Sequence, residues 1–190
     1  MSNTWVISDT HFGHLGVTKF LNDDGSKLRP WDNIEDMDEH MVKVWNGTVS
    51  PTDRVYHLGD VAINRRHLIT LSRLNGRLRL IKGNHDIFKL NDYLPYFDDI
   101  CAYVVKKTPQ GGKCILSHIP VHPESLGRFG LNIHGHLHSN KVMDHRFPDK
   151  WQKVDPRYVN VSVEQIDYRP ILLEDAIARG VPEDITCLKG

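Results

Sequence analysis

The chain has 190 residues, of which 39% are hydrophobic and 25% are charged, and its 24 basic residues balance its 24 acidic ones. This length suits one domain with one core, and the composition is that of a globular protein with no apolar run long enough to cross a bilayer. Zero net charge and the lack of a basic tail argue against long nucleic acid as a partner, and they leave a small anionic substrate open.

The first residues and the cysteines indicate the compartment. Residues 1–4 have neither a basic leader nor an apolar stretch, so we expect a cytoplasmic protein without a membrane partner. Cys101, Cys114 and Cys187 are odd in number and widely spaced, which predicts neither a disulfide framework nor a thiolate zinc site. The sequence carries no sign of an oligomeric state.

Short apolar runs alternate with helical patterns along the chain. Helical periodicity predicts a helix at 34–46 with Asn33 as its N-cap and Gly47 at its end, a second around 68–74, and a third at 173–179 before Gly180. Strands are expected at 5–7, 54–58, 78–81, 102–105, 113–116, 131–133 and 158–163. We therefore predict one α/β domain over 1–190, with helices on both sides of the strands.

Polar clusters follow five of the predicted strands. They are Ser8–His11, Gly59–Asp60, Gly83–Asp86, Ser117–His118 and His134–His138. Because strand ends converge on one crevice in open α/β sheets, we expect these side chains to meet there. Twelve histidines are about three times the average usage, and a rim rich in Asp, Asn and His indicates a cation site.

The spacing within the clusters suits metal chemistry. Asp9 and His11 lie two residues apart, as do His136 and His138, and on an extended segment such side chains point to the same side. A carboxylate such as Asp60 can bridge two cations, and cations about 4 Å apart clamp the oxygens of a phosphate ester. The glycines before Asp60, Asn84 and His136 are expected to let the backbone approach a ligand closely.

The ordered series Asp9-x-His11, Gly59-Asp60, Gly83-Asn84-His85-Asp86, His118 and Gly135-His136-x-His138 resembles the calcineurin-like metallophosphoesterase superfamily. The tail from Asn160 to Asp175 is similar to the end of small bacterial and phage members. The resemblance implies two packed β-sheets flanked by helices, a four-layer sandwich whose site lies at the carboxyl ends of the strands. It also implies two divalent cations.

The resemblance assigns a role to each matching residue. It gives Asp9, His11 and His138 to the first metal and Asn84, His118 and His136 to the second, with Asp60 bridging both. This oxygen and imidazole set suits Mn²⁺, Fe, Co, Ni or Zn, and Mn²⁺ is the first choice. His85 is implied to face the substrate as an acid rather than to bind metal. Asp86 is expected to orient His85 or a ligand histidine.

Residues outside the motif have two readings. His14 is a candidate for the substrate pocket or a surface histidine at a helix start. Arg65 and Arg66 are candidates for holding the substrate or the solvated start of a helix. Without a cap domain, the pocket is expected from the loops at 12–32, 61–67 and 119–133.

Three functions are open. The first is hydrolysis of small phosphodiesters or phosphomonoesters, nucleotides above all, by water that two cations activate. The second is a nuclease or nucleic-acid end-processing phosphatase, which would need a basic channel. The third is a scaffold that binds metal without catalysis, but all seven candidate ligands and His85 are present. The first is preferred.

Overall fold

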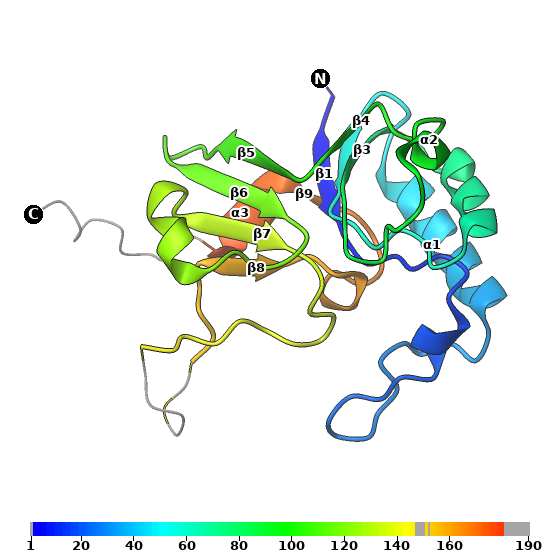
Figure 1. Ribbon diagram of the computed structural model, residues 1–190, viewed down its shortest axis with the longest axis horizontal. Helices are drawn as coiled ribbons and strands as arrows, with labels where there is room; N and C mark the ends of the chain where they lie inside the picture. The colour runs from blue at the N-terminus through cyan, green and yellow to red at the C-terminus, as the bar shows by residue number, and fades with distance from the viewer. Residues whose placement is uncertain (1, 147–150, 152, 181–190) are drawn as a thin grey trace, which may run out of the picture.

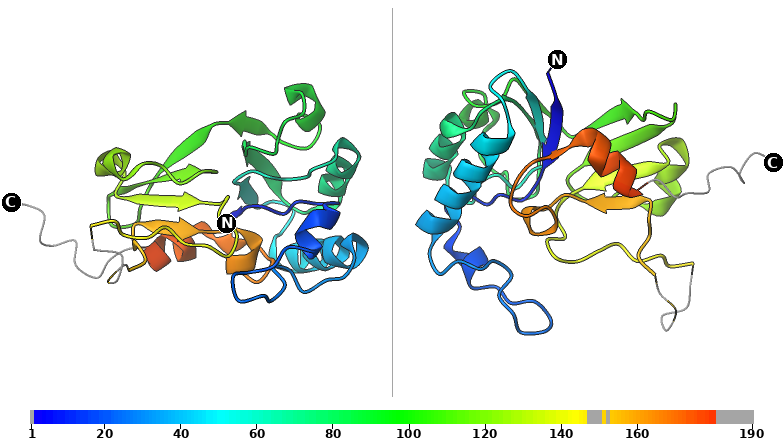
Figure 2. Two further views of the ribbon diagram at one scale, coloured as in Figure 1. Left: turned by 60° about the horizontal axis from the view of Figure 1, so that its bottom comes forward. Right: turned by 180° about the vertical axis from the view of Figure 1, so that it is seen from behind.

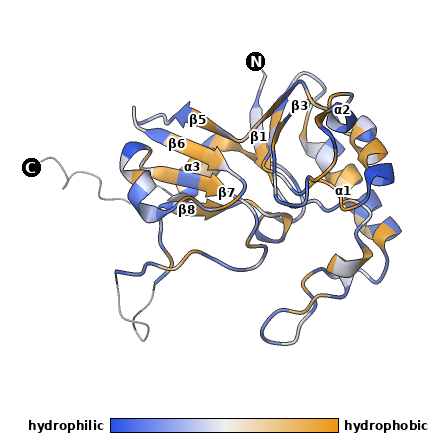
Figure 3. Ribbon diagram, viewed as in Figure 1, coloured by the Kyte–Doolittle hydropathy of each residue, from blue (hydrophilic) through white to orange (hydrophobic). Residues whose placement is uncertain are grey.

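Two β-sheets carry the fold of the chain, whose computed structural model describes residues 2–146, 151 and 153–180 (Figure 1). The class is α/β, with two mixed sheets flanked by helices, as the alternating sequence patterns predicted. One large cluster of buried apolar residues takes members from both sheets and from the helices. In Figure 3 these residues form the orange stretches that run through the strands of both sheets.

The first sheet has the strand order β4-β3-β2-β1-β9. Strands β1 to β4 are parallel, and β9, which the sequence patterns did not predict, pairs antiparallel with β1. Ile7, His57 and Leu80 are aligned across β1, β2 and β3, so the segments that follow these strands leave the sheet at one rim. The strands are β1 (Thr4–Ile7), β2 (Arg54–His57), β3 (Arg77–Ile81), β4 (Asp99–Cys101) and β9 (Ile171–Leu172).

The second sheet has the strand order β5-β6-β7-β8. Here β5 is antiparallel to β6, whereas β6, β7 and β8 are parallel. The two sheets are linked at their rims, because the N–H of Ser8, just after β1, donates to Val161 O (2.9 Å), just after β8. The strands are β5 (Tyr103–Lys107), β6 (Lys113–Ser117), β7 (Leu131–His134) and β8 (Tyr158–Asn160).

Two predicted strands have different bounds in the structure. The run predicted at 102–105 corresponds to β5, which covers 103–107, whereas β4 was not predicted and the chain changes sheets between the two, at Ala102. No Gly or Pro marks this change, so the pattern could not reveal it. The run at 158–163 ends as a strand at Asn160, and a 3₁₀ helix, η5 (Val163–Gln165), follows.

The helix α1 (Ile34–Thr48) begins where the sequence predicted. The Asn33 side chain accepts a hydrogen bond from the Asp36 N–H (2.8 Å), as an N-cap does. Gly47 does not end the helix, which continues through it to Thr48, whose hydroxyl donates to Val44 O (2.7 Å).

The predicted second helix is a 3₁₀ helix, η2 (Arg65–Arg73). Its leucines recur at every third position, which matches three residues per turn better than 3.6. The third predicted helix, α3, includes Gly180 rather than stopping before it. The remaining helices are η1 (Leu15–Thr18), α2 (Leu90–Tyr93), η3 (Pro123–Arg128) and α3 (Leu173–Gly180).

The helices flank the sheets on different sides. α1 lies on the side of the first sheet that faces away from the second sheet (Figure 1). α3 lies behind the second sheet in Figure 1 and in front of it in the rear view of Figure 2, whereas η3 lies on the other side. None of the helices in the described ranges has the length and apolar character needed to cross a membrane. Cys101 and Cys114 are free thiols, and Cys187 lies outside the described residues.

Candidate metal centre

Five loops meet where strands of both sheets end, and they bring together the polar side chains that the sequence singled out. The first sheet supplies Asp9–His11, Asp60 and Asn84–His85, which follow β1, β2 and β3. The second sheet supplies His118 after β6 and His136–His138 after β7. Every candidate residue therefore lies at the carboxyl end of its strand, and the site takes side chains from both sheets.

Five of these residues have a left-handed backbone. The φ angles are 59° at Asp9, 49° at His11, 56° at Asp60, 71° at His136 and 50° at His138. Residues with a side chain rarely adopt such angles, at a cost on the order of 1–3 kcal/mol each, and they cluster at functional sites. The expectation of an extended segment at Asp9 and His11 was wrong, because sharp turns rather than a straight strand direct their side chains.

The glycines of the site let neighbouring loops touch one another. A Cβ on Gly59, where φ is 96°, would lie 2.4 Å from the backbone nitrogen of Gly83. A Cβ on Gly135 would lie 2.0 Å from Ser8 Oγ and 2.4 Å from Asp9 Oδ2. In the structure these glycines make room for the next loop of the site. Their close approach to a ligand stays a prediction.

The first candidate group consists of Asp9, His11 and His138, whose ligand atoms all lie within 4.8 Å of one another. Asp9 Oδ2 accepts hydrogen bonds from the Ser162 hydroxyl (2.9 Å) and the His136 N–H (2.9 Å), while Oδ1 has no partner among the described residues. Both ring nitrogens of the buried His11 also lack a hydrogen bond there. Since buried polar atoms are almost always paired, these free lone pairs fit a cation.

The second candidate group consists of Asp60, His118 and His136, which meet the same distance criterion. The His118 Nδ1–H donates to Leu58 O (2.7 Å), so Nε2 of the neutral ring carries no hydrogen. This Nε2 lies 2.8 Å from Asn84 Oδ1. When Oδ1 and Nε2 both face each other as acceptors, a shared cation is the partner that satisfies them.

Asp60 stands between the two groups. Its Oδ2 lies 3.6 Å from His11 Nε2 of the first group and 3.5 Å from His118 Nε2 of the second. Its Oδ1 accepts a hydrogen bond from the His85 N–H (2.8 Å), which fixes the orientation of the carboxylate. Burial raises the pKa of Asp60, since the anion is poorly solvated there. A cation beside it would remove that cost.

The donor set fits divalent cations of the first transition row. It consists of carboxylate, amide and imidazole groups without a thiolate. Burial, followed by the Arg29 charge, lowers the pKa of His11 well below its ordinary value of 6.5. The ring is therefore neutral at physiological pH, which is the form that binds metal.

An ion pair behind the first group holds His138, and sequence reasoning missed both of its members as functional residues. The His138 Nδ1–H donates to Glu164 Oε1 (3.0 Å), which leaves Nε2 for a ligand. The same oxygen accepts from Arg29 Nε (2.8 Å) and lies 2.8 Å from Arg29 Nη2. Arg29 is fully buried and also donates to Asp9 O (2.6 Å) and Thr10 O (2.8 Å).

Of these two residues, only Glu164 lies in a sequence feature that could have indicated the pair. It lies in the tail for which the sequence indicated a resemblance to small metallophosphoesterases, whereas Arg29 is a single basic residue in a connection without a motif. Arg29 donates to the carbonyl oxygen of the left-handed Asp9 and to that of Thr10, the next residue. The pair therefore links the turn at the end of β1 to the ring of His138.

His85 and Asp86 lie next to Asn84 but point to different surroundings. The His85 side chain is exposed, and its ring centroid lies 5.6 Å from that of His11. Asp86 is buried, and its carboxylate accepts hydrogen bonds from the N–H groups of Asp60 (2.8 Å), Val61 (3.0 Å) and Gly83 (2.8 Å). Contrary to the expectation, no hydrogen bond between Asp86 and a histidine is found among the described residues. Asp86 thus fixes the turn that carries Asp60.

The candidate substrate residues differ in their closeness to the site. His14 is half-buried at the start of η1, with its ring 5.4 Å from that of His11 and its Nδ1 without a partner among the described residues. Arg65 is exposed and pairs with Asp92 of α2 (2.6 Å), and Arg66 Nε donates to His67 Nε2 (3.0 Å). These contacts favour the reading of both arginines as a solvated helix start.

His57 is a buried histidine next to the site. The Gly59 N–H donates to its Nδ1 (3.2 Å), so Nε2–H donates to Thr10 Oγ1 (3.0 Å). Burial, followed by the charge of His118, lowers its pKa to about 3. The ring is therefore a neutral, packed group at physiological pH.

Comparison with known proteins identifies relatives over nearly the whole chain. The protein MJ1445 of Methanocaldococcus jannaschii, described as uncharacterized, is 34% identical over 180 residues, which are 92% of this chain and 89% of MJ1445. The gene 66 protein of Mycobacterium phage L5 is 36% identical over 174 residues, covering 75% of this chain and 81% of the phage protein. No family model matches the chain.

Solved structures support the fold. The crystal structure of AQ665 from Aquifex aeolicus, a protein of unknown function, superimposes with a TM-score of 0.71 and 26% identity over 95% of this chain and all of AQ665. A novel archaeal phosphodiesterase has a TM-score of 0.45 and 18% identity over 83% of this chain and 84% of its own. A TM-score below 0.5 does not establish a common fold, so inference about function rests on the side chains of the site.

Proposed function

This chain belongs to the same family as MJ1445 and the gene 66 protein of phage L5, and we propose that it is a metal-dependent phosphoesterase. Its substrates are small phosphodiesters or phosphomonoesters, with nucleotides as the first choice. The attacking group is water, and two divalent cations, when bound, would supply its activation.

One observation carries the proposal. A single oxygen of Asp60 lies 3.6 Å from a ring nitrogen of the first group and 3.5 Å from one of the second. An oxygen in this position is suited to contact two cations at once. A site for one structural ion needs no such sharing, whereas two-metal phosphoesterases use neighbouring cations to hold the reacting oxygens.

The residues of each group have distinct tasks in this proposal. Asp9, His11 and His138 would hold one cation, and Asn84, His118 and His136 would hold the other, with Asp60 common to both. Such cations polarise phosphoryl oxygens and make water more acidic. Mn²⁺ is the first choice among the metals that suit these donors.

His85 supplies the proton in the proposed reaction. Its ring belongs to neither ligand group, is exposed, and lies beside the ring of His11. Its backbone N–H is tied to Asp60 Oδ1, which places the side chain at the edge of the site. The imidazolium form of His85 donates its proton to the ester oxygen that leaves phosphorus, a contribution of about 10²- to 10⁴-fold in rate.

A hydrolysis panel tests the proposal. Protein loaded with Mn²⁺ is assayed with bis-p-nitrophenyl phosphate, p-nitrophenyl phosphate, 2′,3′-cyclic AMP and single-stranded DNA. We expect turnover of small esters, loss of most turnover in Asp9→Asn, and no change in Asp98→Asn. Asp98 is a surface residue before β4, paired with Arg77 (3.0 Å), and serves as the matched control.

Each contrary outcome points to another function. Cleavage of single-stranded DNA in preference to the small esters would indicate a nuclease. No turnover of any substrate by protein that carries two ions would indicate a scaffold. Equal activity of Asp9→Asn and the wild type would show that the chemistry takes place elsewhere.

A further inference from the structure

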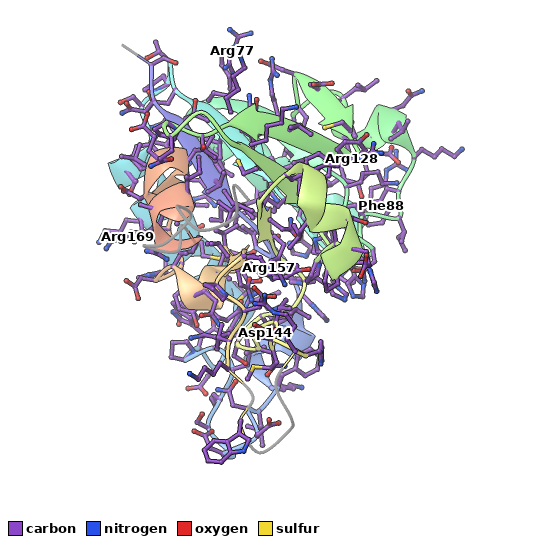
Figure 4. All side chains as sticks on the ribbon, turned by 90° about the vertical axis from the view of Figure 1, so that its left-hand side faces the viewer. Arg77, Phe88, Arg128, Asp144, Arg157 and Arg169 are labelled. Atoms are coloured by element: carbon purple, nitrogen blue, oxygen red, sulfur yellow. The ribbon has the colours of Figure 1, made fainter. Side chains whose placement is uncertain are left out.

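A groove of about 370 Å³ runs alongside the second candidate group. It lies between the loop after β3, the start of β5 and the segment after β6. The segment after β6 leads into η3, which ends at the labelled Arg128 and lies in the foreground of Figure 4. The residues that define it are Lys82, Asn84, Tyr103, His118, Ile119 and Val121.

The groove is continuous with the metal centre. Asn84 and His118 line it and also supply the Oδ1 and Nε2 atoms that lie 2.8 Å apart in the second group. A phosphate ester whose phosphorus lies at the two groups can therefore extend one substituent into the groove.

The wall opposite these residues is apolar and partly open. The Tyr103 side chain is 57% exposed and that of Ile119 is 53% exposed, although both line a cavity. Tyr103 is opposite Ser117 in the antiparallel register of β5 and β6, so its ring stands on the same face as Ile115. No hydrogen bond of the Tyr103 hydroxyl is found within the described ranges, so the ring is free to contact a ligand.

One cationic side chain lies at the rim. Lys82 follows β3 directly, its backbone N–H donates to Cys101 O (3.0 Å), and it has no acidic partner among the described residues. An unpaired ammonium group beside an apolar wall suits a molecule that carries both an anionic group and a flat ring. It does not suit a purely hydrocarbon ligand.

We propose that this groove binds the aromatic ring of the substrate, and that the substrate class is a phosphate ester of a nucleoside. The base stacks against Tyr103 and packs on Ile119, while Lys82 faces phosphoryl oxygens that the metal groups leave free. This inference rests on the proposed function, and it adds the part of the substrate that sets specificity. Contacts of this kind tolerate different bases, because every base has a π-face.

Binding of two probes tests the groove. AMP and ribose 5-phosphate share the phosphate and the sugar and differ by the base. Isothermal titration of Mn²⁺-loaded protein is expected to give AMP the tighter binding by about 5- to 100-fold, the range for stacking of one base. Where a probe is turned over, its KM is compared instead.

Three variants separate stacking from folding effects. Tyr103→Ala and Ile119→Ala, which lie on different segments, should each reduce the AMP advantage and leave the affinity for ribose 5-phosphate unchanged. Tyr103→Phe should keep the advantage, because the ring and not the hydroxyl stacks. Val105→Ala is the matched control, since Val105 is on the same strand, is 39% exposed and does not line the groove.

The outcomes separate the groove from the catalytic proposal. If the wild type binds both probes equally, or if the AMP advantage survives in Tyr103→Ala and Ile119→Ala, the groove is not the base site while the phosphoesterase proposal stands. If neither probe binds and bis-p-nitrophenyl phosphate is not hydrolysed, the phosphoesterase proposal fails and the groove proposal fails with it.

Discussion

Replacing Glu164 by Gln removes one charge from behind the first candidate group without changing the shape of the side chain. In the structure a single oxygen, Oε1, accepts from His138 Nδ1 (3.0 Å) and from Arg29 Nε (2.8 Å) and lies 2.8 Å from Arg29 Nη2, and Oε2 has no partner among the described residues. A glutamine with its amide oxygen at the Oε1 position keeps these three contacts. The variant therefore tests the charge rather than the packing.

Two effects of different size are expected. The Glu164 side chain is only 4% exposed and the Arg29 side chain is fully buried, so the variant leaves the buried Arg29 cation without a negative charge beside it. The free energy of unfolding should therefore fall by about 3–5 kcal/mol. Loss of the carboxylate behind His138 lowers cation affinity at the first group by about 10- to 100-fold, or roughly 1.4–2.8 kcal/mol. The second group has no contact with Glu164, so its affinity should change little.

Two measurements separate these effects. Urea unfolding of the metal-free protein gives the stability change, and Mn²⁺ titration in competition with a chelator gives the affinities of the two sites. Glu174→Gln is the matched control, because Glu174 is exposed on α3. The reasoning is refuted if the variant is destabilised but both affinities are those of the wild type, or if both sites weaken equally.

Three further predictions concern the site and its support. Asp60→Asn should weaken both cations together, since its Oδ2 faces both groups; elemental analysis that finds two ions held at normal affinity would contradict the bridging role. His85→Ala should keep two ions and lose about 10²- to 10⁴-fold in turnover, and loss of an ion would make His85 a ligand instead. The pKa of His57 is about 3 in the folded protein and about 6.5 in the unfolded chain, so between pH 6.5 and pH 3 unfolding takes up a proton. In this range the free energy of unfolding decreases by about 1.4 kcal/mol for each pH unit that the pH falls. Urea unfolding at pH 7 and pH 5 should therefore show a smaller loss in His57→Gln than in the wild type, and equal losses would refute this assignment.

The sequence was informative wherever short-range patterns determine structure. Apolar runs predicted the central strands, and the Asn33 cap predicted the start of α1. The order of motifs at strand ends also predicted that Asp9 and His138 lie together, although 129 positions separate them (138 − 9). This worked because the parallel strands of each sheet end at one rim, and the two rims meet where the Ser8 N–H donates to Val161 O.

Other features depend on contacts that no local pattern records. The contact of Arg29 with Glu164 spans 135 positions, and neither residue belongs to a periodic segment. The change of sheet at Ala102 has no turn residue to mark it. The left-handed turns at Asp9 and His11 are imposed by bonds to another loop, since the His11 N–H donates to Asp60 O (3.0 Å).

Both candidate groups take side chains from the two sheets, and this has a thermodynamic consequence. Asp9 and His11 come from one sheet and His138 from the other, and Asp60 likewise faces His118 and His136 across the junction. Any cation bound here cross-links the two sheets, and its binding site exists only when both sheets are folded. The free energy of unfolding should therefore increase with free cation concentration, by about 1.4 kcal/mol per ion for each tenfold increase above Kd. The melting temperature should rise accordingly.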